Sequence, residues 1–250
     1  MTTTPTVELI PRDILFGNPD KSSPQLSPDG TRMAYIAPVN NVLNVWVGTI
    51  GQDNYRPVTQ DTDRGVRFYA WAADNQHILY IQDVGGNENW RLFATDLRSG
   101  ETRDLTPFQQ VQARVVARDK HFPNELLVGL NKDNPQAHDV YHLDLPSGEL
   151  KLVAQNPGNI VAWVVDAQFK VRGALAASPD GSGSLELLAR ASEEASWDKL
   201  LTWDAEDNQT SGPLGFTLDG RSLYLLDSRN VNAGRLVPVS YTHLTLPTIL

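Results

Sequence analysis

Two histidines, His138 and His142, stand four residues apart and raise the question of a shared metal ion. On a helix this spacing lets two imidazoles bind one zinc ion. The residues from Ala137 to Leu143, however, alternate as a β-strand does, and four residues of strand span about 13 Å. Two ligands at that separation cannot share an ion, so we expect no metal site here.

A second segment, Asp61-Thr62-Asp63-Arg64-Gly65, resembles the start of a calcium-binding loop. Such a loop needs an oxygen ligand at its fifth position and a bidentate glutamate at its twelfth. The sequence has Gly65 and Ala72 at those two positions. We therefore expect a solvated loop between two sheets.

The sequence lacks the residue patterns that usually support nucleophilic catalysis. The chain has no cysteine, which excludes a thiolate nucleophile, a disulfide framework and a zinc–thiolate site. No Gly-x-Ser-x-Gly, His-Glu-x-x-His, Walker or Gly-x-Gly-x-x-Gly motif occurs, and Gly181-Ser182-Gly183-Ser184 has the spacing of a hairpin tip. We assign no catalytic, cofactor-binding or metal-binding residue and expect no cofactor.

Two further groups of residues have both a functional and a structural interpretation. Several polar residues beside predicted strands could line a pore mouth or be ordinary solvated surface: Arg64, Arg67, Asn87, Glu88 and Asn89. The tryptophans suit packing between sheets better than a ligand cage: Trp46, Trp71, Trp90, Trp163, Trp197 and Trp203. The Trp-Asp pairs at 197–198 and 203–204 lie too close together for WD repeats, which have one per blade.

Composition narrows the class of protein. The 250 residues are 40% hydrophobic and 20% charged, which is typical of a globular protein. A net charge of −9 argues against a general nucleic-acid binder. No apolar run of about 18 residues is present, and the first residues lack the features of a secretory signal. We expect a cytoplasmic protein with no membrane segment.

Short apolar runs alternate with turn clusters along the chain, which predicts an all-β protein. Typical runs are 33–37, 78–81, 126–128, 185–188 and 223–226. One short helix is expected at Arg12–Phe16, between Pro11 and Gly17.

The turns repeat with a regular period. The segment 95–101 is echoed by 143–149, an offset of 48 residues. An acidic or amide residue before an apolar strand recurs at Asp29, Asp74, Asn124, Asp166 and Asp219, on average every 47.5 residues. Units of 40–50 residues with about four strands each are typical of β-propeller blades. A two-sheet sandwich is the rival, but it gives no reason for the echo.

We therefore predict an incomplete propeller of about 4.5 four-stranded blades in an open ring, at 24–60, 65–108, 111–155, 158–205 and from 210. Ser178-Pro179-Asp180-Gly181 is expected to join two strands of one blade. The predicted domains are a lead-in at 1–23, the partial propeller at 24–237 and a tail at 238–250. Pro238 interrupts the strand pattern, and the tail is similar to a translated sequencing-adapter remnant; a native strand is the alternative.

Several ordered segments together resemble the N-terminal β-propeller of the prolyl oligopeptidase family, in its acylaminoacyl-peptidase-like branch. The resemblance runs from about residue 9 to residue 237 and is carried by 10–19, 24–35 with Ser27-Pro28-Asp29-Gly30, 44–47, 87–92, 104–108 and 138–141. The resemblance implies seven or eight blades that cap an α/β-hydrolase domain, which is the expected partner and holds the catalytic Ser, Asp and His.

No position here matches those catalytic residues, so the resemblance implies an inactive propeller fragment of a serine peptidase. It also implies short peptide substrates, with access to the hydrolase domain limited by the propeller. A stand-alone, TolB-like propeller that binds a protein or a ligand is the second hypothesis; it needs a ring that closes within this chain.

Overall fold

The computed structural model describes residues 10–16 and 20–240. Its helix α1 spans Arg12–Phe16, as predicted, and begins where the Ile14 and Leu15 amides donate hydrogen bonds to the Pro11 carbonyl. Gly17, the expected end of this helix, lies outside the described residues. A short 3₁₀ helix, η1, spans Asp207–Gln209.

The described strands form five antiparallel sheets in chain order. Their strands are β1 Ser22–Leu26, β2 Arg32–Val39, β3 Val42–Thr49 and β4 Arg56–Pro57; β5 Tyr69–Trp71, β6 His77–Gln82, β7 Arg91–Asp96 and β8 Thr102–Asp104; β9 Ala113–Ala117, β10 Glu125–Asn134, β11 Ala137–Asp144 and β12 Leu150–Ala154; β13 Ile160–Val165, β14 Val171–Ala177, β15 Leu185–Ala189 and β16 Asp198–Trp203; and β17 Gly212–Phe216, β18 Ser222–Asp227 and β19 Arg235–Ser240.

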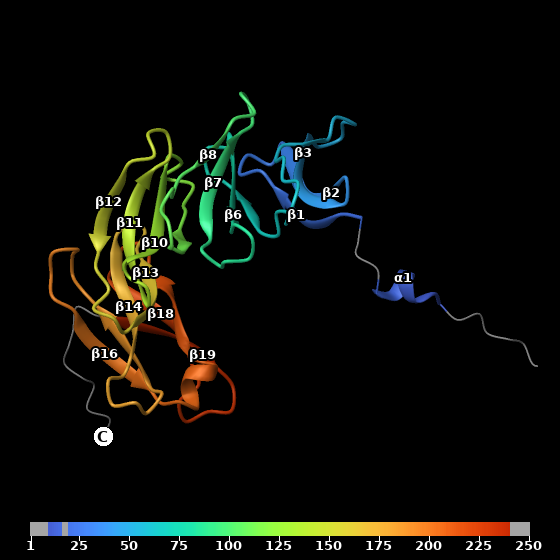
Figure 1. The fold of residues 1–250 in the computed structure, drawn as a ribbon. Coiled ribbons are helices and arrows are strands. Elements are labelled where there is room, and N and C mark those ends of the chain that lie inside the picture. The colour runs from blue at the N-terminus through green and yellow to red at the C-terminus, as the bar shows by residue number, and fades with distance from the viewer. Residues whose placement is uncertain (1–9, 17–19, 241–250) are drawn as a thin grey trace, which may run out of the picture.

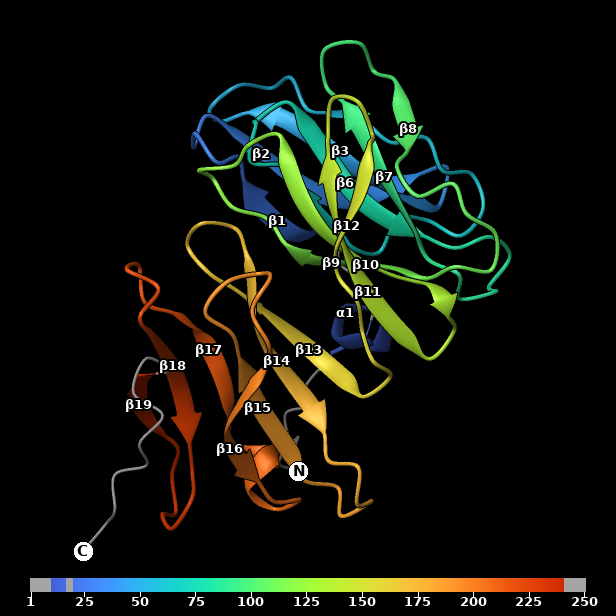
Figure 2. The same ribbon diagram turned by 90° about the vertical axis from the view of Figure 1, so that its left-hand side faces the viewer.

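Each sheet is a meander of consecutive strands, and the sheets follow one another along an arc (Figure 1). We number the five sheets blades 1 to 5 in chain order. The turned view shows blade 5, β17–β19, beside blade 4, β13–β16 (Figure 2). Blade 1 does not meet blade 5 (Figure 1). The predicted all-β propeller with an open ring is confirmed. A two-sheet sandwich is excluded, and 178–181 does join β14 to β15 within one blade.

The periodic acidic residues hold the turn between the first and second strands of a blade. The Oδ1 atom of Asp29 accepts a hydrogen bond from the Thr31 amide, and Asp219 does the same for Arg221. Asp74 and Asp166 accept from the amides two residues later. A carboxylate that bonds the backbone two residues on fixes a turn locally, which explains the marker in blades 1, 2, 4 and 5.

These turn carboxylates predict a loss of stability in acid. Hydrogen bonds from the Ser27 hydroxyl and from Thr31 lower the pKa of Asp29 to about 2, and a hydrogen bond from the Thr217 hydroxyl lowers the pKa of Asp219. A pKa that is lower in the folded chain means that the unfolded chain binds more protons as the pH falls.

Stability is therefore fully present above about pH 4 and is lost as the pH falls toward 2. Urea midpoints measured at several pH values should drop over this range, and less steeply in the double variant Asp29→Asn, Asp219→Asn. Asp53→Asn, at an exposed aspartate between β3 and β4, is the control. Equal slopes in the double variant and the wild type would contradict the prediction.

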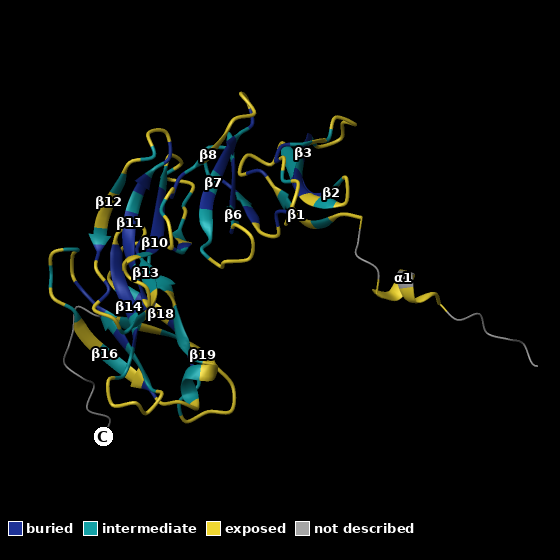
Figure 3. Cartoon of the chain, viewed as in Figure 1, coloured by how far each residue is buried: buried dark blue, intermediate teal, exposed yellow. Residues whose placement is uncertain are grey.

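The hydrophobic core is divided into four clusters, one between each pair of neighbouring blades. Along β6, Ile78 and Tyr80 belong to the cluster shared with blade 1, whereas Leu79 belongs to the cluster shared with blade 3. Successive side chains of a strand point to opposite faces, so a strand buried on both faces is apolar at every position. Buried residues accordingly run through the middle of the sheets in Figure 3.

Side-chain hydrogen bonds to backbone carbonyls join neighbouring blades. Arg32 donates to the Asn75 carbonyl between blades 1 and 2, and Arg103 Nη1 to the Pro146 carbonyl (2.8 Å) between blades 2 and 3. Trp163 Nε1 donates to the His138 carbonyl (3.1 Å) between blades 3 and 4, and Arg172 Nη2 to the Gly220 carbonyl (3.2 Å) between blades 4 and 5. The blades are thus linked by directional contacts as well as by apolar packing.

The strand expected to end at Val237 continues through Pro238 to Ser240 as β19. Pro238 pairs with Tyr224 of β18, and β19 is the edge strand of its sheet. An edge strand tolerates proline because one side of its backbone has no partner strand to bond. The pattern break at Pro238 therefore did not mark the end of the strand; the rest of the predicted tail, 241–250, lies outside the described residues.

The outer face of blade 5 is apolar and open. On β18, Leu223 and Leu225 face blade 4 and are fully buried, whereas Tyr224 and Leu226 on the opposite face remain about 40% exposed (41% and 37%). In blades 2 and 3 both faces are covered by neighbours. Strand β18 is therefore apolar on both faces, as are the strands of blades that have a neighbour on each side.

Candidate binding site between blades 2 and 3

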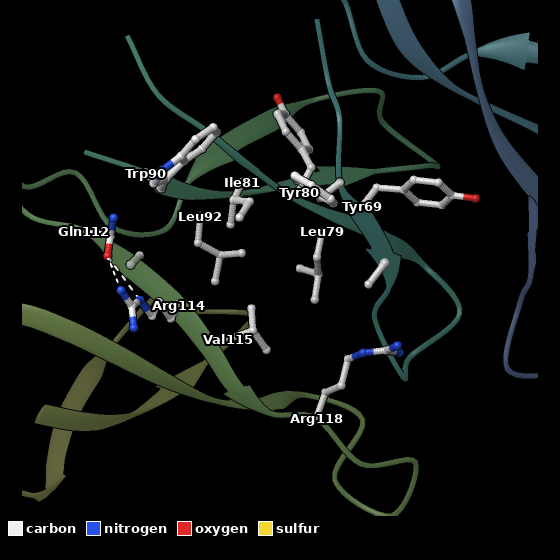
Figure 4. Close-up of a pocket in the computed structure, with 13 residues that line it drawn as sticks. Tyr69, Leu79, Tyr80, Ile81, Trp90, Leu92, Gln112, Arg114, Val115 and Arg118 are labelled. Atoms are coloured by element: carbon white, nitrogen blue, oxygen red, sulfur yellow. Dashed lines mark hydrogen bonds between the residues drawn. The ribbon is translucent and has the colours of Figure 1, made fainter. Parts of the chain in front are cut away.

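A cavity of about 520 Å³ lies between blade 2 and the first strand of blade 3. Its wall comes from β5, β6 and β7 on one side and from β9 on the other (Figure 4). The lining residues are Phe68, Tyr69, Ala70, Leu79, Tyr80, Ile81, Trp90, Leu92, Gln112, Ala113, Arg114, Val115 and Arg118. Ligand pockets typically have this size and this mixture of apolar walls with a few polar groups.

Two tyrosines of the wall are held in place by contacts outside the cavity. Tyr69 donates its hydroxyl hydrogen to the Ser23 carbonyl (2.7 Å), and Tyr80 stacks on Phe93 with ring centroids 5.2 Å apart. Burial raises the pKa of both tyrosines. Both phenols are therefore protonated at neutral pH and cannot act there as general bases.

Arg114 on β9 and Arg118, directly after the end of β9, lie at opposite ends of the cavity (Figure 4). Arg114 donates through Nε and Nη2 to the Gln112 side chain (3.1 and 2.8 Å). Arg118 donates through Nη1 to the Trp71 carbonyl (3.0 Å). Neither guanidinium has a carboxylate within 4 Å among residues 10–16 and 20–240, so two arginine charges line the cavity without an ion-pair partner at that distance.

The two histidines of the pair have different surroundings. Both residues lie on β11, which is a strand as predicted. His142 contacts Glu125 (2.6 Å), whereas His138 Nε2 is buried and has no hydrogen-bond partner within residues 10–16 and 20–240. Burial and the positive charge of Arg114 lower the pKa of His138, so its neutral form is favoured. No cluster of three metal-ligating side chains occurs in the described part of the chain.

The polar residues considered for a pore mouth surround the hairpin between β6 and β7. Arg64 Nε lies 3.2 Å from Asp83, and the Glu88 amide donates to the same carboxylate (3.1 Å). Asn87 caps its own turn by accepting from the Asn89 amide, while Arg67 is exposed. The structure thus brings four of the five together, and their role in a pore stays a prediction.

The calcium-like segment uses its first carboxylate within its own loop. Asp61 accepts hydrogen bonds from the amides of Asp63 and Gly65, and the segment connects blade 1 to blade 2. This is the inter-sheet loop expected from the sequence.

The tryptophans divide between core and cavity. Trp71 and Trp203 are fully buried between blades, and Trp163 packs on Trp197 with ring centroids 6.1 Å apart. Trp90 is only partly buried because one of its faces lines the cavity. The sequence pattern predicts packing for Trp90 and assigns no role to Arg114 and Arg118. The only sequence signal for these two residues is a pair of arginines at i and i+4 beside an apolar strand.

Comparisons with known proteins give two sequence relatives of much greater length. The chain is 40% identical over 233 residues to dipeptidyl aminopeptidase BIII of Pseudoxanthomonas mexicana, covering 93% of this chain and 33% of the relative. It is 29% identical over 250 residues to dipeptidyl peptidase family member 6 of Caenorhabditis elegans, covering 94% and 33%. The chain therefore spans about a third of each relative. No family model matches it.

Solved structures share the fold. A prolyl endopeptidase matches with a TM-score of 0.63 at 11% identity, over 88% of this chain and 33% of that one. Prolyl oligopeptidase B of Galerina marginata matches with 0.60 at 12% identity, over 89% and 32%. The chain is homologous to dipeptidyl peptidases and has the propeller fold of prolyl oligopeptidases. TolB of Acinetobacter baumannii also matches, with 0.50 at 14% identity, over 88% and 51%.

These similarities place the cavity in a propeller related to those of peptidases, as the sequence resemblance implied. The named sequence relatives are dipeptidyl peptidases, and the acylaminoacyl-peptidase-like branch stays a prediction. None of the helices described is long and apolar enough to span a bilayer.

Proposed function

We propose that this chain is the propeller portion of a serine peptidase and controls the access of short peptides to an α/β-hydrolase domain that it does not contain. The observation that carries the proposal is the 40% identity to one third of a dipeptidyl aminopeptidase. A propeller that restricts entry would admit peptides and keep folded proteins away from a water-excluding active site.

Two exposed apolar surfaces support the proposal that this chain is part of a larger protein. The face of blade 5 that carries Tyr224 and Leu226 is open, although neighbouring blades bury theirs. The segment around α1 also exposes apolar side chains, with Ile14 71% and Phe16 80% exposed. Exposed apolar groups that gather in this way mark surfaces that other protein elements cover. Further blades and the hydrolase domain are the proposed covers.

Sequencing the source gene downstream of the codon for Ser240 tests the proposal. We expect further blades and then a Gly-x-Ser-x-Gly motif. The complete gene product should react with a serine-directed fluorophosphonate and cleave short peptides but not folded proteins. The 250-residue chain should do neither. A native stop codon directly after the propeller would overturn the proposal.

A stand-alone binding propeller is the second candidate, and the similarity to TolB over most of this chain favours it. That function requires a propeller that is complete without a hydrolase domain. The same sequencing experiment separates the two candidates. The cytoplasmic location and the domain boundaries at 23/24 and 237/238 stay predictions; fractionation of cells that carry the complete gene checks the location.

A further inference from the structure

We propose that the cavity between blades 2 and 3 binds the carboxy-terminal residues of a short apolar peptide, with Arg118 as the anchor for the terminal carboxylate. The choice of a peptide as occupant rests on the proposed function, whereas the chemistry of the cavity stands independently of it. The size of the cavity, its two arginines and the edge strand β9 support this occupant.

The size and lining suit one or two apolar side chains. The volume of about 520 Å³ lies within the range of small-molecule sites. Leu79, Ile81 and Leu92 form an aliphatic floor, and Figure 4 shows them pointing into the space between β6, β7 and β9. Trp90 adds aromatic surface at one side, so an aliphatic or aromatic side chain would be removed from water there.

The two arginines differ in which donors are free. Arg114 uses its Nε and Nη2 edge on Gln112, and Gln112 in turn donates to the Glu88 carbonyl (3.1 Å). Arg118 uses only Nη1, so within the described chain its Nε and Nη2 edge bonds no acceptor. That edge offers two parallel N–H groups, the geometry that binds a carboxylate in bidentate fashion. Arg118 is therefore the anchor, and Arg114 contributes positive charge from the other end.

Asp119, the acidic residue next to Arg118 in the chain, is engaged through one of its two carboxylate oxygens. Asp119 accepts hydrogen bonds from the amide and the Nδ1 atom of His121 (2.8 and 2.7 Å). The residues that line the cavity include no aspartate or glutamate. A carboxylate brought by a ligand would thus meet a positive site without a competing anion from the wall.

The backbone favours a peptide over a free organic acid. β9 is the edge strand of its sheet, in the order β12-β11-β10-β9, and it forms one wall of the cavity. On this edge the Ala113 amide already donates to the Trp90 carbonyl (2.7 Å). The backbone groups of β9 beyond Ala113 that have no partner strand can bond an extended peptide, whereas a fatty acid has no peptide groups to bond them. Peptide groups next to the terminal carboxylate would therefore add contacts that a simple acid lacks.

Direct binding to the 250-residue chain tests this proposal. The chain is coupled to a biosensor surface at low density through a carboxy-terminal tag, which prevents self-association. The probes are acetyl-Leu-Phe with a free carboxylate, its carboxy-terminal amide, and octanoate. We expect the free peptide to bind at least tenfold more tightly than the amide and than octanoate. The amide lacks the terminal carboxylate, and octanoate lacks the peptide groups.

Matched variants locate the binding. Arg118→Gln should weaken binding of the free peptide at least tenfold, Arg114→Gln less than threefold, and Arg221→Gln, at an exposed arginine on the β17–β18 hairpin, not at all. Val115→Trp should block binding by filling the cavity. Near-ultraviolet circular dichroism confirms that each variant keeps its packing.

Three outcomes overturn the inference. Equal affinity for peptide and amide removes the carboxylate anchor, unchanged binding in Arg118→Gln removes the site, and equal affinity for octanoate identifies a free-acid site instead. Catalysis plays no part in this assay. Failure to bind, in a protein whose complete gene encodes an active peptidase, would reject the cavity alone; peptide binding without a hydrolase domain in the gene would reject only the proposed function.

Discussion

Replacing Arg172 with methionine is expected to lower the free energy of unfolding by about 3–5 kcal/mol. Arg172 lies at the junction of blades 4 and 5, where its Nη1 atom is 3.0 Å from the Asp166 carboxylate. Both side chains are almost completely buried, at 9% and 2% exposure. Removing the guanidinium leaves the Asp166 charge buried without its partner, which costs more than losing an exposed ion pair.

Three further contacts of Arg172 disappear in this variant. Its Nε atom donates to the Arg190 carbonyl (3.1 Å), its Nη2 atom donates to the Gly220 carbonyl, and the guanidinium lies 5.1 Å from the Phe216 ring. Two of these contacts cross to blade 5. Loosening of blade 5 should therefore accompany the loss of stability.

Urea denaturation followed by circular dichroism measures the effect. Lys199→Met is the matched control, because its ion pair with Glu186 (3.2 Å) is solvent-exposed and is worth less than about 1 kcal/mol. The double variant Arg172→Met, Asp166→Asn should recover part of the loss, since it no longer buries an unpaired charge and keeps an oxygen that can accept from the Gln168 and Lys170 amides. A loss below 1 kcal/mol in Arg172→Met would contradict the predicted role of the pair.

Replacing Trp71 with alanine is expected to destabilise the chain by a similar amount, about 3–5 kcal/mol. Trp71 is 2% exposed and belongs to the cluster between blades 1 and 2. Its Nε1 atom donates to the Gln25 carbonyl (3.3 Å), and the Arg32 guanidinium lies 5.2 Å from its ring. The variant loses this contact across the junction and leaves a cavity the size of an indole ring.

Trp46→Ala is the matched control for this prediction. Trp46 is only partly buried and stacks on Tyr35 within blade 1, with ring centroids 6.4 Å apart. We expect its loss to cost less than half as much as the loss of Trp71, as measured by the same urea titration. Equal effects of the two substitutions would mean that the junction between blades adds nothing beyond the burial of an indole.

The sequence predicted the propeller because the features that define a blade are local. Asp29 and Asp219 each bond the backbone two residues away, so the turns they fix can be recognised from neighbouring residues. The residues Ile78, Leu79 and Tyr80 are apolar in succession because both faces of β6 are covered. The turn marker recurs every 42–53 residues, which predicts a series of similar sheets along the chain. The structure has five sheets in that order.

The candidate site could not be predicted in the same way. Tyr69, Trp90 and Arg118 come from three segments of two different blades, and the cavity exists only because β9 stands away from β5 and β6. No local spacing encodes that separation, which depends on how two twisted sheets pack against each other. The free edge of the Arg118 guanidinium is likewise decided by the Trp71 carbonyl of the neighbouring blade.

Pro238 shows the same division between local and tertiary information. Its residue type predicts an interruption of a central strand, and that expectation is sound for a strand with partners on both sides. Only the sheet order reveals that β19 is an edge strand, where the missing amide costs no ladder bond. The sequence by itself determined the number and the order of the sheets, because hairpins and turns form between near neighbours in the chain. Tertiary packing alone decided which strand edges and guanidinium groups remain free to bind a ligand, because those depend on contacts between residues that are distant in the chain.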